Sequence, residues 1–251
     1  MLKIIINADD FGCNKQITEE IQRLLLAKKI TSTTIMANGR FLNNAADFAL
    51  KHPEFSYGAH LCLSEFASLT QSDTLKKYGI IDERGDFVKF RIFQIRHFPE
   101  DLLLAIKQEL IQQITMLKEK GLVLSHIDSH HHVHTIYPLK NIFVEIAKQF
   151  QIKYIRRGTE FNSFRAKLHI KQFWERRALN KYYSSELITT DLFLPFSQIS
   201  LLFKKQSIRI VELMCHPGNT ENESFSTEIQ QIENMQINYQ GMFQLVNYNQ
   251  L

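Results

Sequence analysis

Five of the chain's ten histidines lie within nine residues, in the stretch HIDSHHHVH at positions 126–134. If residues 125–130 form a strand, the two-residue side-chain period places His126, Asp128 and His130 on one face. Neutral imidazoles and a carboxylate on a rigid element are ligands for a divalent metal ion, and a carboxylate can also orient a ligand histidine from behind. The stretch therefore predicts a metal site, with His126 and Asp128 as supporting or substrate-binding residues.

The histidines that follow have a simpler explanation. A metal ion accepts only about three or four protein ligands. We therefore expect His131, His132 and His134 mainly to cap loops or to bond to backbone carbonyls.

Two adjacent carboxylates, Asp9 and Asp10, follow an apolar run at residues 3–8. Neighbouring carboxylates repel each other, and the repulsion is relieved if one binds a cation while the other accepts a proton. On its own, an Asp pair before Phe-Gly is more often part of a turn and a helix cap. Combined with histidines from other strands, it predicts a hydrolytic metal site.

Further polar residues lie in or at the ends of predicted strands: His60, Arg156 and His216. His216 precedes a Pro-Gly turn that would present its imidazole to a cleft, so it is a candidate general acid, with a structural turn histidine as the alternative. Arg156 is a candidate for binding substrate hydroxyls or stabilising charge, or for pairing with a structural carboxylate.

The candidate site residues are positioned by strands and helices that are predicted to alternate along the chain. Short apolar or β-branched runs predict strands at 3–8, 31–39, 55–63, 122–130, 153–157 and 208–216. Amphipathic or capped segments predict helices at 15–29, 43–52, 99–120, 138–150, 170–181 and 227–235. The alternation predicts an α/β fold of parallel βαβ units in a single domain, 1–251, with the irregular segment 69–98 passing over one face. In such folds the loops at the carboxyl ends of the strands converge, and there we expect the polar residues to meet.

Composition excludes several classes of protein. The net charge of +4 is spread thinly and lacks the clustered basic face of a nucleic-acid-binding protein. No apolar run is long enough for a transmembrane segment, and the N-terminus lacks the pattern of a signal peptide, so we expect a cytoplasmic location. The chain has three cysteines, Cys13, Cys62 and Cys215, without CxxC spacing, and we expect free thiols instead of a cysteine-rich zinc site. The sequence leaves open a homodimer.

Several motifs in order resemble the YdjC family of carbohydrate deacetylases, which includes chitooligosaccharide deacetylases and hopanoid-associated proteins. The matching stretches are NADDFG, TSTTIMANG, GAHL, HIDSHHHVH and ELMCHPG, and they run from residue 3 to about 218. The resemblance implies a distorted or seven-stranded parallel (β/α) barrel of the glycoside hydrolase/deacetylase type. It also implies one divalent metal ion and removal of an N-acetyl group from an acetamido sugar or oligosaccharide.

Carried over by position, the resemblance implies that His60, His130 and one of the two aspartates bind the metal. By analogy with polysaccharide deacetylases, Asp10 is the ligand and Asp9 the base, with the reverse assignment as the alternative. A metal-activated water would attack the amide carbonyl, Asp9 would take its proton, and His216 would protonate the leaving amine. Two histidines and a carboxylate suit zinc, whereas magnesium prefers oxygen ligands, so either ion remains a candidate.

The sequence departs from the family pattern beside the site. Cys13 and Asn14 stand where many relatives resemble DFGLS, and HLCLSE, at residues 60–65, replaces a more usual run after the implied ligand His60. These residues are expected to shape the substrate cleft, which leaves the sugar open. Two other functions remain alternatives: a non-catalytic protein that binds a sugar or lipid headgroup on a degenerate barrel, and a metal-dependent phosphoesterase, which usually needs two metal ions.

Overall fold

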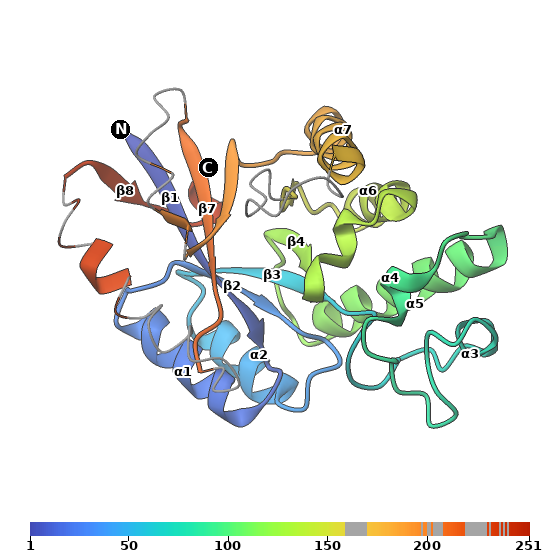
Figure 1. Cartoon of the computed structure of the whole chain (residues 1–251). Coiled ribbons are helices and arrows are strands. Elements are labelled where there is room, and N and C mark those ends of the chain that lie inside the picture. Colours follow the sequence, from blue (N-terminus) through green and yellow to red (C-terminus); the bar gives the residue numbers. More distant parts are fainter. Residues whose placement is uncertain are drawn as a thin grey trace.

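The core of the computed structural model is a parallel sheet that curls into a half-barrel (Figure 1). The structure describes residues 1–158, 170–196, 198–199, 202, 208–218, 230, 232–235, 237, 239 and 241–251, without the side chains of 170–173. Within this part, seven strands follow the order β5-β4-β3-β2-β1-β7-β6, and an eighth, β8, pairs with β1. The strands are β1 (Leu2–Phe11), β2 (Ser32–Ile35), β3 (Ser56–Leu61), β4 (His126–Ser129), β5 (Tyr154–Ile155), β6 (Leu192–Pro195), β7 (Ile210–Cys215) and β8 (Phe243–Leu245). The predicted α/β class and distorted parallel barrel are confirmed.

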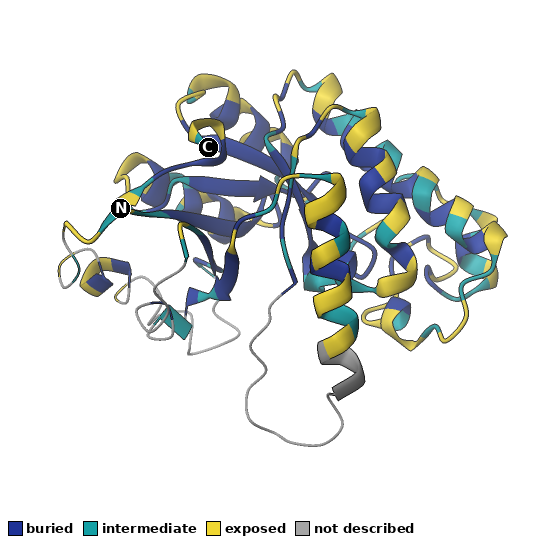
Figure 2. Cartoon of the chain, turned by 90° about the horizontal axis from the view of Figure 1, so that it is seen from above, coloured by how far each residue is buried: buried dark blue, intermediate teal, exposed yellow. Residues whose placement is uncertain are grey.

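Helices cover the outer face of the curled sheet and turn their buried sides toward it (Figure 2). The longer ones are α1 (Lys15–Leu26), α2 (Leu42–Lys51), α5 (Glu100–Glu119), α6 (Lys140–Gln149) and α7 (Ile170–Glu186). Two short helices, α3 (Asp73–Lys77) and α4 (Arg91–Gln94), lie in the excursion between β3 and α5, and 3-10 turns occupy His130–Thr135, Tyr137–Leu139 and Tyr248–Gln250. The side chain of Asn14 caps α1 by accepting a hydrogen bond from the backbone N–H of Ile17.

Side chains of β1 alternate between two environments. Ile4 and Ile6 belong to the large core cluster that packs beneath the helices, whereas Ile5 contacts Val246 and Tyr248 in a smaller cluster. Because strand side chains alternate, Asn7 and Asp9 share the face of Ile5, which is the concave face of the sheet. The two-residue period of β1 therefore brings an aspartate to the inside of the half-barrel.

Most predicted elements are present with changed boundaries, but strands β6 and β8 and the short helices α3 and α4 were not predicted. Strand β6 has only four residues and ends in a proline, so it lacks the length by which a strand is usually recognised. The predicted helix at 227–235 lies partly outside the described residues. Across the described residues, we find no helix with the length and apolarity needed to span a membrane.

Candidate active site

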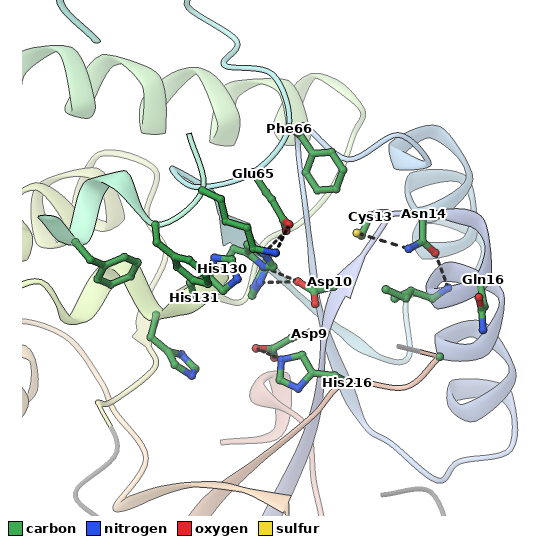
Figure 3. Close-up of a pocket in the computed structure, with 17 residues that line it drawn as sticks. Asp9, Asp10, Cys13, Asn14, Gln16, Glu65, Phe66, His130, His131 and His216 are labelled. Carbon is green, nitrogen blue, oxygen red and sulfur yellow. Dashed lines mark hydrogen bonds and ion pairs between the residues drawn. The ribbon is translucent and has the colours of Figure 1, made fainter. Parts of the chain in front are cut away.

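Three predicted metal ligands from different strands meet at the carboxyl ends of the sheet. Asp10 is the penultimate residue of β1, His60 lies in β3, and His130 begins the 3-10 turn that follows β4. One ligand atom from each lies within 4.8 Å of the others, with Asp10 Oδ1 2.8 Å from His130 Nδ1 and 3.1 Å from His60 Nε2. The three side chains are nearly inaccessible to solvent. They form the floor of a pocket of about 810 Å³ (Figure 3).

A local irregularity in β1 directs both aspartates toward this region. Consecutive strand residues normally point to opposite faces. The register with β2 shifts between Ala8 and Phe11, and Asp10 has a left-handed backbone with φ of 69°. Such a bulge re-aims side chains near functional sites, so that Asp9 and Asp10 both line the pocket.

Each candidate ligand histidine is held from behind by a second carboxylate. His60 donates a hydrogen bond from Nδ1 to Asp128 Oδ1 at 2.7 Å, and His130 donates from Nε2 to Glu65 Oε2 at 2.7 Å. The other ring nitrogen of each histidine faces Asp10. This is the carboxylate–histidine arrangement that orients metal ligands in proteins.

The same contacts set the protonation of the cluster. Burial by itself lowers the pKa of His130, but the carboxylates of Asp10 and Glu65 raise it to about 9. The hydrogen bond from His130 lowers the pKa of Glu65 to about 2. Burial raises the pKa of Asp10, yet His130 and His60 hold it well below its usual value. Without a metal ion, protons on the two histidines therefore balance the carboxylates.

Beneath the cluster, Arg156 lies fully buried among three carboxylates. Its terminal nitrogens lie 2.6 and 2.7 Å from the two oxygens of Asp9, and 2.8 Å separates one of them from Asp128 Oδ2. Its Nε donates to Glu212 Oε1 at 2.7 Å. Although burial raises the pKa of Asp9, Arg156 lowers it well below its ordinary value. Arg156 thus holds Asp9 ionised. It is fully buried and does not line the pocket, which favours the predicted alternative, pairing with a structural carboxylate, over contact with substrate hydroxyls.

His216 reaches the pocket as its sequence position predicts. It follows β7, its side chain is 23% exposed, and its Nε2 lies 3.9 Å from Asp9 Oδ2. Figure 3 shows the two residues side by side, on the opposite side of the pocket from Glu65.

The structure does not bring His126 to the pocket. Its ring stacks on Tyr248 with centroids 3.8 Å apart, and it is fully buried. It shares the inner face of β4 with Asp128, but it lies two residues toward the start of the strand and therefore deeper in the half-barrel. Its assignment as a supporting or substrate-binding residue is thus not favoured by its position.

The trailing histidines separate into two groups. His134 is buried and its Nδ1 lies 2.6 Å from Ser129 Oγ, which fits a loop-stabilising role. His131 and His132 line the pocket, and both have left-handed backbone. His131 also joins Glu65 and His130 in a second group of side chains close enough to share an ion.

Two acidic residues near the site were missed by the sequence analysis. Glu65 lies in the loop after β3, where no periodic signal exists to single it out. Glu212 is the one charged residue of β7, in an otherwise apolar buried strand, and that pattern could have revealed it. All three cysteines are free and buried, and no metal-competent group found among the described residues contains one.

Comparisons with known proteins agree with this fold. The family model described as YdjC-like protein matches residues 3–247. A carbohydrate deacetylase of Oceanobacillus iheyensis is 28% identical over 229 residues, covering 88% of each chain. One from Vibrio cholerae serotype O1 is 32% identical over 219 residues, covering 86% of this chain and 79% of that one. The solved structure of a proposed cellobiose-phosphate cleavage protein from Enterococcus faecalis V583 has a TM-score of 0.75 at 23% identity, covers 99% of this chain and 98% of that one, and has the same fold. The match over nearly the whole chain shows that this protein belongs to the YdjC-like family.

Proposed function

We propose that this protein is a metal-dependent hydrolase that removes the N-acetyl group from an acetamido sugar, such as a chitooligosaccharide or a related glycoconjugate. The observation that carries the proposal is the convergence of Asp10, His60 and His130 at the floor of a pocket, with a carboxylate behind each histidine. The curated relatives named carbohydrate deacetylase support the reaction class.

The donor set fits one divalent ion. Two imidazole nitrogens and a carboxylate oxygen lie within 4.8 Å of one another, and catalytic zinc sites use three such protein ligands and leave a fourth position for water. Zinc suits these donors better than magnesium does. When bound, such an ion would polarise the acetamido carbonyl and lower the pKa of a water molecule.

The chain's own residues would supply the proton transfers. Asp9 is kept ionised by Arg156. Its Oδ1 accepts hydrogen bonds from both Arg156 and Asn7, whereas its Oδ2 retains a lone pair beyond the one that the guanidinium uses. It can therefore accept the proton of the attacking water. His216 lies beside Asp9 and is partly exposed to the pocket, where it can protonate the departing amine.

The test is acetate release from N,N′-diacetylchitobiose and from N-acetylglucosamine, with zinc, magnesium and cobalt supplied in turn. We expect chelation and His130→Ala each to abolish release, because either removes part of the metal site. His97→Ala is the matched control, since His97 is an exposed histidine outside the pocket.

Other outcomes would identify the alternatives. Activity that survives both chelation and His130→Ala would overturn the proposal. Sugar and metal binding without turnover of any acetamido compound would indicate a binding protein. Release of phosphate from sugar phosphates, with two ions bound per chain, would indicate a phosphoesterase.

A further inference from the structure

Strained backbone is concentrated around the pocket. Eight non-glycine residues among those described have positive φ, and five of them line the pocket: Asp10, Phe66, Phe90, His131 and His132. Holding such a residue in this conformation costs free energy, and backbone strain of this kind clusters at active sites and ligand-binding segments. Around the pocket, therefore, non-glycine side chains occupy backbone positions whose conformation would favour glycine.

Phe90 is the clearest case. Its φ is 59°, a value that favours glycine, yet an aromatic residue occupies the position. Burial does not explain this choice, because Phe90 is 46% exposed. Its neighbour on α4, Phe93, is 43% exposed, and the two ring centroids are 6.4 Å apart. Both rings line the pocket and leave apolar surface open to it.

A row of three aromatic rings runs from the candidate metal ligand His130 through His131 to Phe90. The ring of His131 lies 4.0 Å from that of His130, and the ring of Phe90 lies 4.5 Å from that of His131, measured between centroids. Phe90 is therefore one ring further from the site floor than His131. A group bound beside Phe90 would be next to, and separate from, the group held at Asp10, His60 and His130.

Polar groups border the two phenylalanines. Lys89 Nζ lies 5.6 Å from the centre of the Phe90 ring and 3.3 Å from Glu65 Oε1. His131 Nδ1 lies 2.8 Å from Ser64 Oγ. A pyranose ring has apolar C–H faces and a polar hydroxyl edge, which matches a small aromatic surface with charged neighbours. A lipid chain would need a larger continuous apolar patch.

We infer that Phe90 and Phe93 form a stacking surface for a second pyranose ring, adjacent to the ring whose acetamido group is hydrolysed. This inference rests on the proposed function and extends it, because it assigns selectivity for oligosaccharides over monosaccharides to two residues of the excursion between β3 and α5. A pocket of about 810 Å³ lies in the size range that holds drug-sized ligands, which include disaccharides.

The experiment compares Phe90→Gly, Phe93→Ala and the control Val88→Ala. Val88 is also exposed and on the same excursion, but it does not line the pocket. Phe90→Gly removes the ring and relieves the positive φ, so its melting temperature should equal or exceed that of the wild type. The ratio of kcat/KM for N,N′-diacetylchitobiose to that for N-acetylglucosamine should fall about tenfold in Phe90→Gly and Phe93→Ala, through a higher KM for the disaccharide. Val88→Ala should keep the wild-type ratio.

A second readout separates this inference from the proposed function. Calorimetric binding of chitobiose, the fully deacetylated disaccharide, should weaken about tenfold in the two phenylalanine variants whether or not the protein turns over any substrate. An unchanged ratio together with unchanged chitobiose binding would overturn the stacking surface. An equal fall in kcat/KM for the monosaccharide and the disaccharide would also overturn the inference, because the Phe90 and Phe93 rings would then contact the first sugar. If the two phenylalanine substitutions weakened only the binding of a lipid-linked acetamido sugar, the surface would bind a lipid chain and not a second pyranose ring.

Discussion

Replacing Arg156 with methionine is the most direct test of how the inside of the half-barrel is held together. The substitution keeps an unbranched side chain of similar length and removes the positive charge. Asp9, Asp128 and Glu212 would remain, all essentially inaccessible to water, without the cation that now lies 2.6–2.8 Å from each of them.

The expected loss of stability is large. Removing one partner of a buried ion pair typically costs about 3–5 kcal/mol, because the remaining charge stays buried and unpaired. Here three carboxylates lose the same partner, so we expect a loss at or above the upper end of that range. Since a domain is stable by only about 5–15 kcal/mol, a substantial fraction of its stability depends on this one side chain.

The assay is urea unfolding of Arg156→Met, Arg156→Lys and the exposed control Arg84→Met. Lysine keeps the charge but cannot span both oxygens of Asp9, so its loss should be intermediate. It also provides a measurable variant if the methionine protein does not fold. Arg84→Met should change the free energy of unfolding by less than about 0.5 kcal/mol.

The pH dependence gives an independent check of the cause. The folded-state pKa of Asp9 is lowered, so its contribution to wild-type stability is present above the ordinary value near 4 and is lost as pH falls through the folded pKa. In Arg156→Met the cation that lowers the pKa of Asp9 is gone, so this carboxylate takes up a proton more readily as pH falls. The stability gap between the two proteins should therefore narrow from pH 7 to pH 4. A loss below about 1 kcal/mol at pH 7, or a gap that is constant with pH, would refute the reasoning.

Three further predictions concern other parts of the site. Tyr248→Phe removes the hydroxyl that donates to Glu212 Oε2 at 2.7 Å, and should cost about 1–3 kcal/mol in urea unfolding by leaving a buried carboxylate oxygen unpaired; an unchanged midpoint would contradict this. Because the pKa of His130 is raised to about 9 in the metal-free protein, a metal ion must displace its proton below that pH. Zinc affinity should therefore rise from pH 6.5 to about 9, with proton release visible by calorimetry in buffers of different ionisation enthalpy, and a flat profile would count against His130 as a ligand. Burial raises the pKa of the Cys13 thiol to about 12, so iodoacetamide at pH 8 should label it only after unfolding, and rapid labelling of the folded protein would show that its environment differs.

Local patterns in the sequence were enough to predict the parallel α/β class and many of the site residues. The two-residue period of β1 sends Ile5, Asn7 and Asp9 inward, and the cap and apolar spacing of α1 identify a helix that packs outside the sheet. These signals act over a few residues, because they arise from strand and helix geometry. The assignment of Asp10, His60 and His130 as metal ligands came instead from the resemblance to the YdjC family, whose motifs contain them.

Tertiary structure decided the contacts between these segments. Glu65 reaches His130 from a loop with no periodic pattern, and Arg156 reaches Asp9 across 147 positions of the chain. His126 has the same strand and face as Asp128 but lies deeper, against Tyr248 from the C-terminal end. Strand order and the depth of each residue within the curled sheet determine which side chains meet, and neither is encoded in the spacing of residues along a single element.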